Sequence, residues 1–138
     1  MNKDYELNIK KLLRFDDERG SIFVLERSSL PFEVKRAFIT FHTEGERGGH
    51  AHLVAEELLI CLKGSLEVQI TSKNGDFNVS LSTPDTALYI PSKMWLRLKN
   101  IKKDSIILVL ASEPYESKDS IADFNEFMSI INQGDDSS

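Results

Sequence analysis

The sequence predicts an all-β fold, a sandwich or barrel of short strands that carries one amphipathic helix near its C-terminus. Turn-forming residues recur at intervals of roughly 8–12 residues, the spacing expected of short strands in such folds. From Leu66 to Thr71 apolar and polar residues alternate, so one face of that strand should be buried and the other wet. Helical spacing is found in one apolar series near the C-terminus: Ile121, Phe124, Met128 and Ile131.

Turn residues divide the chain into the expected strands. Ser28, Ser29 and Pro31 end the first strand, and the glycine-rich segment 44–49 ends the second. Lys63-Gly64 is typical of a two-residue hairpin turn, and residues 73–76 (Lys-Asn-Gly-Asp) are typical of another. The strands expected from these boundaries, in order, are 22–26, 35–43, 57–62, 65–71, 77–81, 86–90, 95–98 and 106–112.

The C-terminal helix is expected from Ser120 to about Asn132, packed on the outside of the barrel. Ser120 with Asp123 forms a capping pattern at its start, and its apolar stripe should contact the core. The sequence contains no repeats and no linker, so we expect one domain over residues 1–133 and a disordered tail over 134–138.

Composition limits the classes of partner. The chain has 138 residues, 41% of them hydrophobic, and its net charge is −5. Acidic and basic residues are interspersed along the sequence, which leaves no basic stripe for binding nucleic acid. No apolar stretch approaches the roughly 18 residues of a membrane span, so we expect no membrane association. The N-terminal segment is polar and Cys61 is the one cysteine, within an apolar run, which favours a cytoplasmic protein.

The segment Arg47-Gly48-Gly49-His50-Ala51-His52 is the strongest indication of a functional site. The chain has three histidines, and two of them stand here with one residue between them. Alternate side chains of a strand point to the same face, so His50 and His52 should project side by side. Two imidazoles in one place suit either proton transfer or metal binding.

The spacing from His50 through Glu57 to Gly64 matches the first half of the cupin metal motif, in which a β-barrel holds a divalent ion. The second half should supply another histidine near residues 91–96, where the sequence has none, and His42 is expected in a different strand, 35–43. We therefore expect no metal and no other cofactor. A three-ligand site of His50, His52 and Glu57 is the alternative.

Without a metal, the two imidazoles suit removal of a proton next to a carbonyl and its return at the neighbouring atom. Arg19 and Arg47, each followed by glycine, are the candidate clamps for a phosphorylated ligand, because guanidinium binds phosphate oxygens bidentately. Tyr89 and Trp95 are aromatic residues that could stack on a base or sugar, and Glu113 and Tyr115 could lie on the rim of the same cleft.

The chain resembles the cupin-type sugar 3,4-ketoisomerases from about residue 16 to residue 131. The likeness lies in an ordered set of segments: 17–21, 31–36, 47–52, 59–65, 88–90 with Trp95, and 109–113 before Tyr115. It implies a small cupin (jelly-roll) β-barrel that binds no metal and forms homodimers by exchange of N-terminal strands. It also implies that the substrate is dTDP-4-keto-6-deoxyglucose, whose carbonyl moves from C4 to C3. The product would enter a pathway to 3-amino-3,6-dideoxy sugars of bacterial surface polysaccharides, such as the O-antigen of lipopolysaccharide.

The resemblance also implies roles for single residues. His50 and His52 would be the acid/base pair, Arg19 and Arg47 would hold the sugar or pyrophosphate, and Trp95 would help to wall the pocket. Three positions depart from the family's usual pattern: Phe38 where tyrosine is usual, Leu96 where histidine or arginine is frequent, and Glu57 where a neutral residue is frequent. Because the first two remove polar groups from the site, a catalytically silent nucleotide-sugar binding module is a second functional hypothesis.

Overall fold

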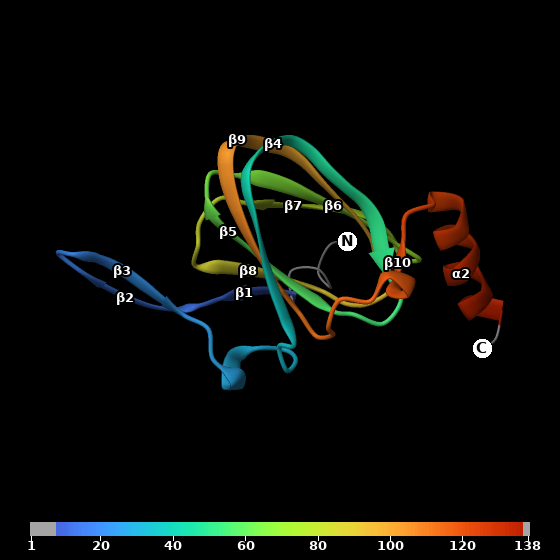
Figure 1. The fold of residues 1–138 in the computed structure, drawn as a ribbon, viewed down its shortest axis with the longest axis horizontal. Coiled ribbons are helices and arrows are strands. Elements are labelled where there is room, and N and C mark those ends of the chain that lie inside the picture. The colour runs from blue at the N-terminus through green and yellow to red at the C-terminus, as the bar shows by residue number, and fades with distance from the viewer. Residues whose placement is uncertain (1–7, 137–138) are drawn as a thin grey trace.

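The structure, a computed structural model, describes residues 8–136, and strands wound into a small barrel make up most of it (Figure 1). One α-helix, α2 (Phe124–Asp136), and two 3-10 helices, η1 (Arg27–Ser29) and η2 (Ser117–Asp119), complete the described chain. The predicted all-β fold with one C-terminal helix is confirmed. The strands are β1 (Ile9–Lys11), β2 (Leu13–Asp17), β3 (Gly20–Val24), β4 (Arg36–His52), β5 (Glu57–Lys63), β6 (Leu66–Ser72), β7 (Gly75–Leu81), β8 (Thr86–Ile90), β9 (Trp95–Ala111) and β10 (Ser120–Ile121).

Two long strands, β4 and β9, organise the barrel. Each has 17 residues, and they pair antiparallel with each other from Arg36 opposite Ala111 to Ala51 opposite Trp95. The second half of β9 also pairs with β5, and its first half pairs with β6. The inner side chains of these strands close the core around residues that are almost completely buried: Leu59, Val68, Ile70, Leu88 and Ile107.

The glycine-rich segment 44–49 is part of β4, so its prediction as a turn was wrong, and so was the expectation that His42 lies in a different strand from His50 and His52. The register between β4 and β9 shifts several times along this stretch, which marks β-bulges. Gly45, Gly48 and Gly49 all have positive φ, the conformation that such irregularities require. A Cβ on Gly48 would lie 2.9 Å from the carbonyl oxygen of Leu96, so close approach to β9 also demands glycine there. Predicted strands 95–98 and 106–112 are likewise one strand, β9.

The predicted hairpin turn at Lys63-Gly64 was also wrong, because β5 and β6 pair with different halves of β9. The chain turns a corner of the barrel here. Gly64 has a φ of 90°, and a Cβ on it would lie 2.1 Å from Oγ of the buried Ser105. The second predicted hairpin is present, since Ser72 pairs with Gly75 between β6 and β7.

Helix α2 begins at Phe124, not at Ser120 as predicted. Ser120 and Ile121 instead form β10, which pairs with His52 and Ala51 at the end of β4. The helix is capped by Asp123, whose Oδ1 accepts a hydrogen bond of 3.0 Å from the backbone N–H of Glu126. It extends to Asp136, past the expected start of the disordered tail, and Ser137 and Ser138 lie outside the described residues.

The helix packs on one end of the barrel and does not resemble a membrane segment. Its Phe127 and Ile131 are buried against Ala51, Trp95 and Ile121. In the described part of the chain, no helix combines the length and the apolar character needed to cross a bilayer.

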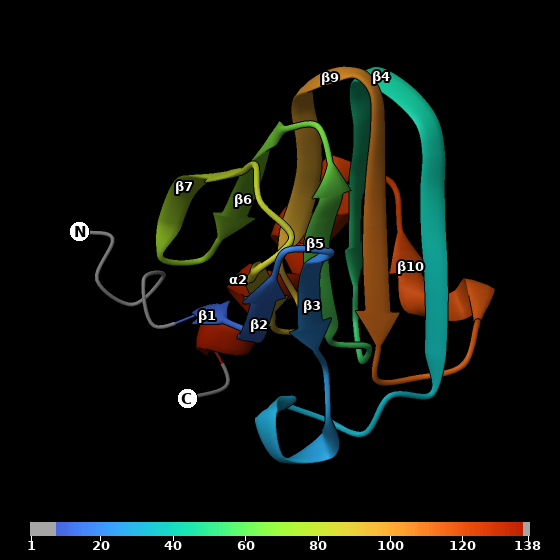
Figure 2. The ribbon, with the colours of Figure 1, turned by 90° about the vertical axis from the view of Figure 1, so that its left-hand side faces the viewer.

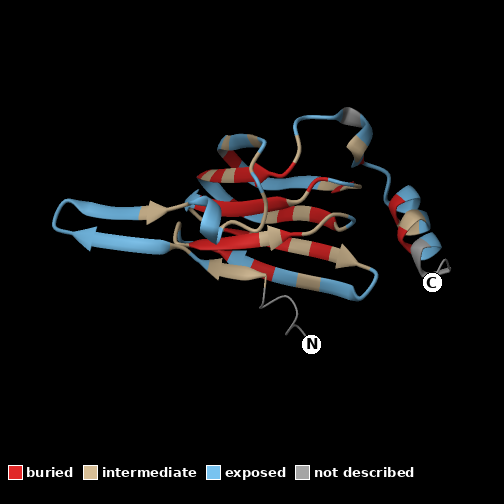
Figure 3. Cartoon of the chain, turned by 90° about the horizontal axis from the view of Figure 1, so that it is seen from below, coloured by how far each residue is buried: buried red, intermediate tan, exposed pale blue. Residues whose placement is uncertain are grey.

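Strands β2 and β3 form a separate two-stranded sheet, which we call the arm, and it projects away from the barrel (Figures 1 and 2). The sequence predicted part of β3 and missed β1 and β2. Most of the arm is exposed, and the end of β3 next to the barrel is half-buried (Figure 3). Three apolar side chains of the arm are exposed: Leu13 (52% exposed), Phe15 (56%) and Ile22 (63%).

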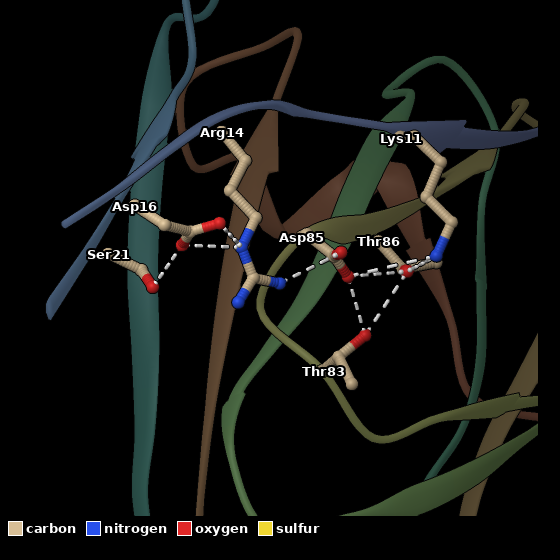
Figure 4. A network of polar contacts seen from close by, with 7 residues as sticks. All are labelled: Lys11, Arg14, Asp16, Ser21, Thr83, Asp85 and Thr86. Atoms are coloured by element: carbon tan, nitrogen blue, oxygen red, sulfur yellow. Dashed lines mark hydrogen bonds and ion pairs between the residues drawn. The ribbon is translucent and has the colours of Figure 1, made fainter.

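A polar network joins the base of the arm to the loop before β8 (Figure 4). Lys11 Nζ donates to Thr86 Oγ1 at 2.9 Å, and Arg14 pairs with Asp85 at 3.3 Å. These contacts are mostly exposed and each contributes little stability. They hold the base of the arm while its tip extends from the barrel.

Candidate active site

An open pocket of about 440 Å³ contains both histidines of the His-x-His motif. Because β4 curls along β9, residues from both of its ends reach this pocket, together with Glu57 from β5 and several residues from segment 114–122. The residues that line it are Arg36, Phe38, Gly48, Gly49, His50, His52, Glu57, Pro114, Tyr115, Glu116, Asp119, Ser120 and Ala122.

His50 and His52 lie side by side on one face of β4, as the alternation predicts. Their ring centroids are 5.2 Å apart and the rings meet edge to face. Neighbouring backbone fixes this end of the strand: Ser120 of β10 pairs with His52, and the N–H of Lys93 donates to the His52 carbonyl at 2.7 Å. The imidazoles therefore project from a rigid part of the barrel.

His52 lies between two carboxylates. Its Nε2 is 3.3 Å from Oε2 of Glu57, and its Nδ1 is 3.2 Å from Oδ2 of Asp119. The hydrogen bond to Glu57 and the negative charges of Glu57 and Asp119 raise the pKa of His52, against the opposing effects of burial and of Arg36. The charged form of this imidazole is thus favoured.

His50 is shifted the other way. Burial lowers its pKa, and the nearby charge of His52 lowers it further, while the charge of Glu57 acts in the opposite sense. The neutral form of His50 is thus favoured beside a charged His52. Two like groups whose pKa values are pushed apart are the arrangement expected of a general base and its acid partner.

Arg36 is a pocket residue that the sequence analysis missed. Its guanidinium carbon lies 5.4 Å from the ring centroid of Phe38 and 5.9 Å from that of Tyr115, within the range of cation–π contact. Its Nε is buried and has no hydrogen-bond partner among the described residues. The signal available in the sequence was alternation, since Arg36 and Phe38 share one face of β4, as His50 and His52 do.

Phe38 and Tyr115 both line the pocket; Phe38 is a substrate-binding candidate at the position where the family usually has tyrosine, and Tyr115 was expected on the rim. Leu96 is 5% exposed and stands opposite His50 on β9. It borders a small void that is also lined by both histidines and Glu57, and whose other lining residues, Ala55, Ile90, Pro91 and Met94, are apolar.

The other predicted substrate-binding residues do not meet in this pocket. Arg47 is exposed on β4, and Arg19 lies in the turn at the tip of the arm, where it pairs with Asp17. Trp95 is buried against Phe124 and Phe127, and borders a separate open pocket on the side of α2. Tyr89 donates a hydrogen bond of 2.5 Å to Glu56 and packs in a cluster outside the barrel interior.

The metal alternative has a geometric basis. One ligand atom from each of His50, His52 and Glu57 lies within 4.8 Å of the others. A zinc ion would need nitrogen ligands at about 2.0–2.1 Å. It would also displace the proton that His52 shares with Glu57, so metal and ion pair are mutually exclusive uses of these groups.

Comparison with known proteins identifies the family of this chain. The model of the FdtA family (WxcM-like, C-terminal) matches residues 5–132. A TDP-4-oxo-6-deoxy-alpha-D-glucose-3,4-oxoisomerase from Aneurinibacillus thermoaerophilus is 34% identical over 128 residues, which are 91% of this chain and 90% of the relative.

Solved structures show the same similarity. A 3,4-ketoisomerase from Helicobacter canadensis matches with a TM-score of 0.87 and 34% identity, over 90% of this chain and 96% of the other. The WlaRB TDP-quinovose 3,4-ketoisomerase from Campylobacter jejuni matches with a TM-score of 0.84 and 35% identity, over 88% of this chain and 95% of the other. The chain therefore belongs to the FdtA (WxcM-like) family of cupin-type sugar 3,4-ketoisomerases.

Proposed function

We propose that this protein is an isomerase that moves the carbonyl of dTDP-4-keto-6-deoxyglucose from C4 to C3. The observation that carries the proposal is the His50–His52 pair, two adjacent imidazoles of opposite pKa shift in an open pocket. The name of the relative from Aneurinibacillus thermoaerophilus specifies a TDP-linked 4-oxo-6-deoxyglucose as its substrate, which supports the same class of substrate here.

The reaction needs one base and one acid. His50, as the neutral imidazole, removes the proton from C3, and the C–H electrons form a C3=C4 double bond while the C4 carbonyl oxygen becomes the enediolate oxygen. The positive charge of His52 favours that oxygen anion. That oxygen takes a proton from His52. Loss of the O3 proton to His52 then forms the C3 carbonyl as C4 accepts a proton from His50, so the product is an isomer, both histidines regain their starting charge and no redox cofactor is consumed.

Arg36 is the group best placed to bind the diphosphate of the substrate. The rings of Phe38 and Tyr115 hold its guanidinium at the pocket wall, and its buried Nε has a free donor site. A preorganised planar guanidinium suits bidentate binding of phosphate oxygens. Tyr115 is 75% exposed and would be available to stack on the nucleotide base.

We also propose a homodimer in which the arm of each subunit reaches the other. Arg19 lies at the tip of an arm that projects away from its own barrel (Figure 1). The exposed apolar side chains Leu13, Phe15 and Ile22 are the kind of surface that a partner covers. In such a dimer, Arg19 would serve the pocket of the second subunit.

The 3-keto product is the electrophile that an aminotransferase requires, so the next step would give a 3-amino-3,6-dideoxy sugar for surface polysaccharide. A cytoplasmic location would suit such a pathway enzyme, and the buried free thiol of Cys61 is compatible with a reducing compartment.

Two alternatives use the same pocket. Phe38 in the open pocket and Leu96 in the small void place apolar groups near the histidines, which favours a binding module without turnover. The His50–His52–Glu57 cluster favours a metal-dependent enzyme. Both are distinguished from the isomerase by measurement of turnover and of bound metal.

The decisive experiment is proton NMR of the purified protein with dTDP-4-keto-6-deoxyglucose in deuterium oxide. The expected result is deuterium incorporation together with the signal of a 3-keto product. The coupling constants of the C4 proton, measured on product formed in ordinary water, then distinguish the gluco from the galacto configuration. Binding without exchange or product would reject the isomerase in favour of the binding module.

A further inference from the structure

Asp119, at the end of η2, organises the backbone that follows His52. Its carbonyl oxygen accepts a hydrogen bond from the N–H of Leu53 at 2.9 Å. Its carboxylate accepts from the next two N–H groups, those of Val54 at 2.6 Å and Ala55 at 3.1 Å. Three consecutive amides therefore converge on one residue, and its side chain is 11% exposed.

The same carboxylate faces the catalytic ring. Oδ2 of Asp119 lies 3.2 Å from Nδ1 of His52, although off the line of a well-formed hydrogen bond, so the contact is mainly electrostatic. Nδ1 is buried and has no hydrogen-bond partner among the described residues. The negative charge of Asp119 compensates the loss of hydrogen bonding at this buried nitrogen, while Glu57 contacts the other nitrogen of the ring.

We propose that Asp119 is a positioning residue for the isomerisation, which holds the His52 ring between two carboxylates and ties its orientation to the C-terminal segment. Four charged or titratable groups face His52: Glu57 from β5, His50 and Arg36 from β4, and Asp119 from η2. Of these, Asp119 alone is also fixed by the backbone directly after His52. The effect on turnover rests on the proposed function; the effect on the ring does not.

The test is the variant Asp119→Asn, which keeps an oxygen acceptor for one backbone N–H and removes the charge beside Nδ1. We expect kcat to fall by about 10- to 100-fold, the usual effect of losing such an orienting partner, with KM little changed. We also expect the 15N resonance of His52 Nδ1 to move toward the position of an unprotonated nitrogen.

Asp123→Asn is the matched control, because Asp123 caps α2 through the N–H of Glu126 and lies on the same segment. Because asparagine caps a helix about as well as aspartate, this variant should leave stability nearly unchanged, and it should neither lower kcat nor move the His52 resonance. Equal losses of kcat in both variants, or an unchanged Nδ1 resonance in Asp119→Asn, would overturn the proposal. A wild-type protein without turnover would reject the proposed function, and the His52 resonance would still decide the role of Asp119.

Discussion

At the scale of single residues, the two histidines belong to one short sequence motif, but the fold gives them different charged neighbours. The spacing of His50 and His52 predicts their common face, and the structure agrees. It cannot predict which one is charged, because that depends on Glu57 and Asp119, which reach His52 from β5 and η2. For the same reason, the sequence analysis missed Arg36 and Asp119, whose roles come from distant contacts.

The opposite pKa shifts predict the pH dependence of kcat/KM. In the proposed mechanism His50 must be neutral, and because its pKa is lowered, activity should be lost only below the ordinary histidine value of about 6.5. His52 must be charged, and because its pKa is raised, activity should persist above that value before it falls. A plateau that brackets pH 6.5 in a pH–rate series is the expected result.

Glu57→Gln tests the assignment of the upper limb of this profile to His52. Removal of the carboxylate that contributes most to raising the pKa of His52 should move that limb to lower pH. Glu56→Gln is the matched control, since Glu56 accepts from Tyr89 and does not line the pocket. An upper limb that is the same in both variants would show that it belongs to another group.

Chelation separates proton transfer from metal catalysis. If the His50–His52 pair works as an acid and a base, exhaustive dialysis against a chelator should leave kcat/KM unchanged. Added zinc should inhibit, because the ion competes for the lone pairs of the imidazoles. Loss of activity on chelation, with recovery on return of a divalent ion, would favour the three-ligand site with Glu57.

At the scale of elements, the positions of several strands were predictable from the sequence, but the pairing between strands was not. Alternation locates β6 and turn residues locate β8 closely, but neither signal can reveal that β5 and β6 pair with different halves of β9. A glycine in the sequence does not by itself show whether it marks a turn or a close contact, because the contact depends on strand pairing. Gly75 belongs to a true hairpin turn, whereas Gly48 and Gly64 are required by close contacts with residues far away in sequence.

Gly64→Ala should therefore be more destabilising than Gly75→Ala. Both glycines have positive φ, at which alanine costs roughly 1–2 kcal/mol. At Gly64 the new Cβ would also collide with Ser105, and overpacking adds typically about 1–3 kcal/mol. Nothing lies within 4 Å of a Cβ at Gly75. Urea unfolding of both variants provides the comparison, and equal losses of unfolding free energy would contradict the corner geometry.

At the scale of the whole molecule, the chain divides into a barrel with its own core and an arm without one. Composition and strand spacing predicted one all-β domain, and the described residues form one barrel with the arm attached. What they could not predict was the projection of β2 and β3. It depends on how the base of the arm is held against the loop before β8 (Figure 4).

Subunit mixing tests whether Arg19 acts in the pocket of a partner. His50→Asn alone should lose about 10²–10⁴-fold of its turnover, the contribution of general acid–base catalysis, and Arg19→Ala alone should also be impaired. If the arm is exchanged, a mixed dimer has one complete pocket. An equal mixture refolded together should therefore regain about a quarter of wild-type activity, since half of randomly paired dimers are mixed.

The control for this experiment is a mixture of His50→Asn with His52→Asn. Both residues belong to one subunit's pocket, because both lie at the same end of β4, so no pairing of these variants creates a complete site. This mixture should stay inactive. If the mixture of His50→Asn with Arg19→Ala also stays inactive, although sedimentation shows dimers, Arg19 does not serve the second pocket. The apolar arm then has a role in assembly and none in binding substrate.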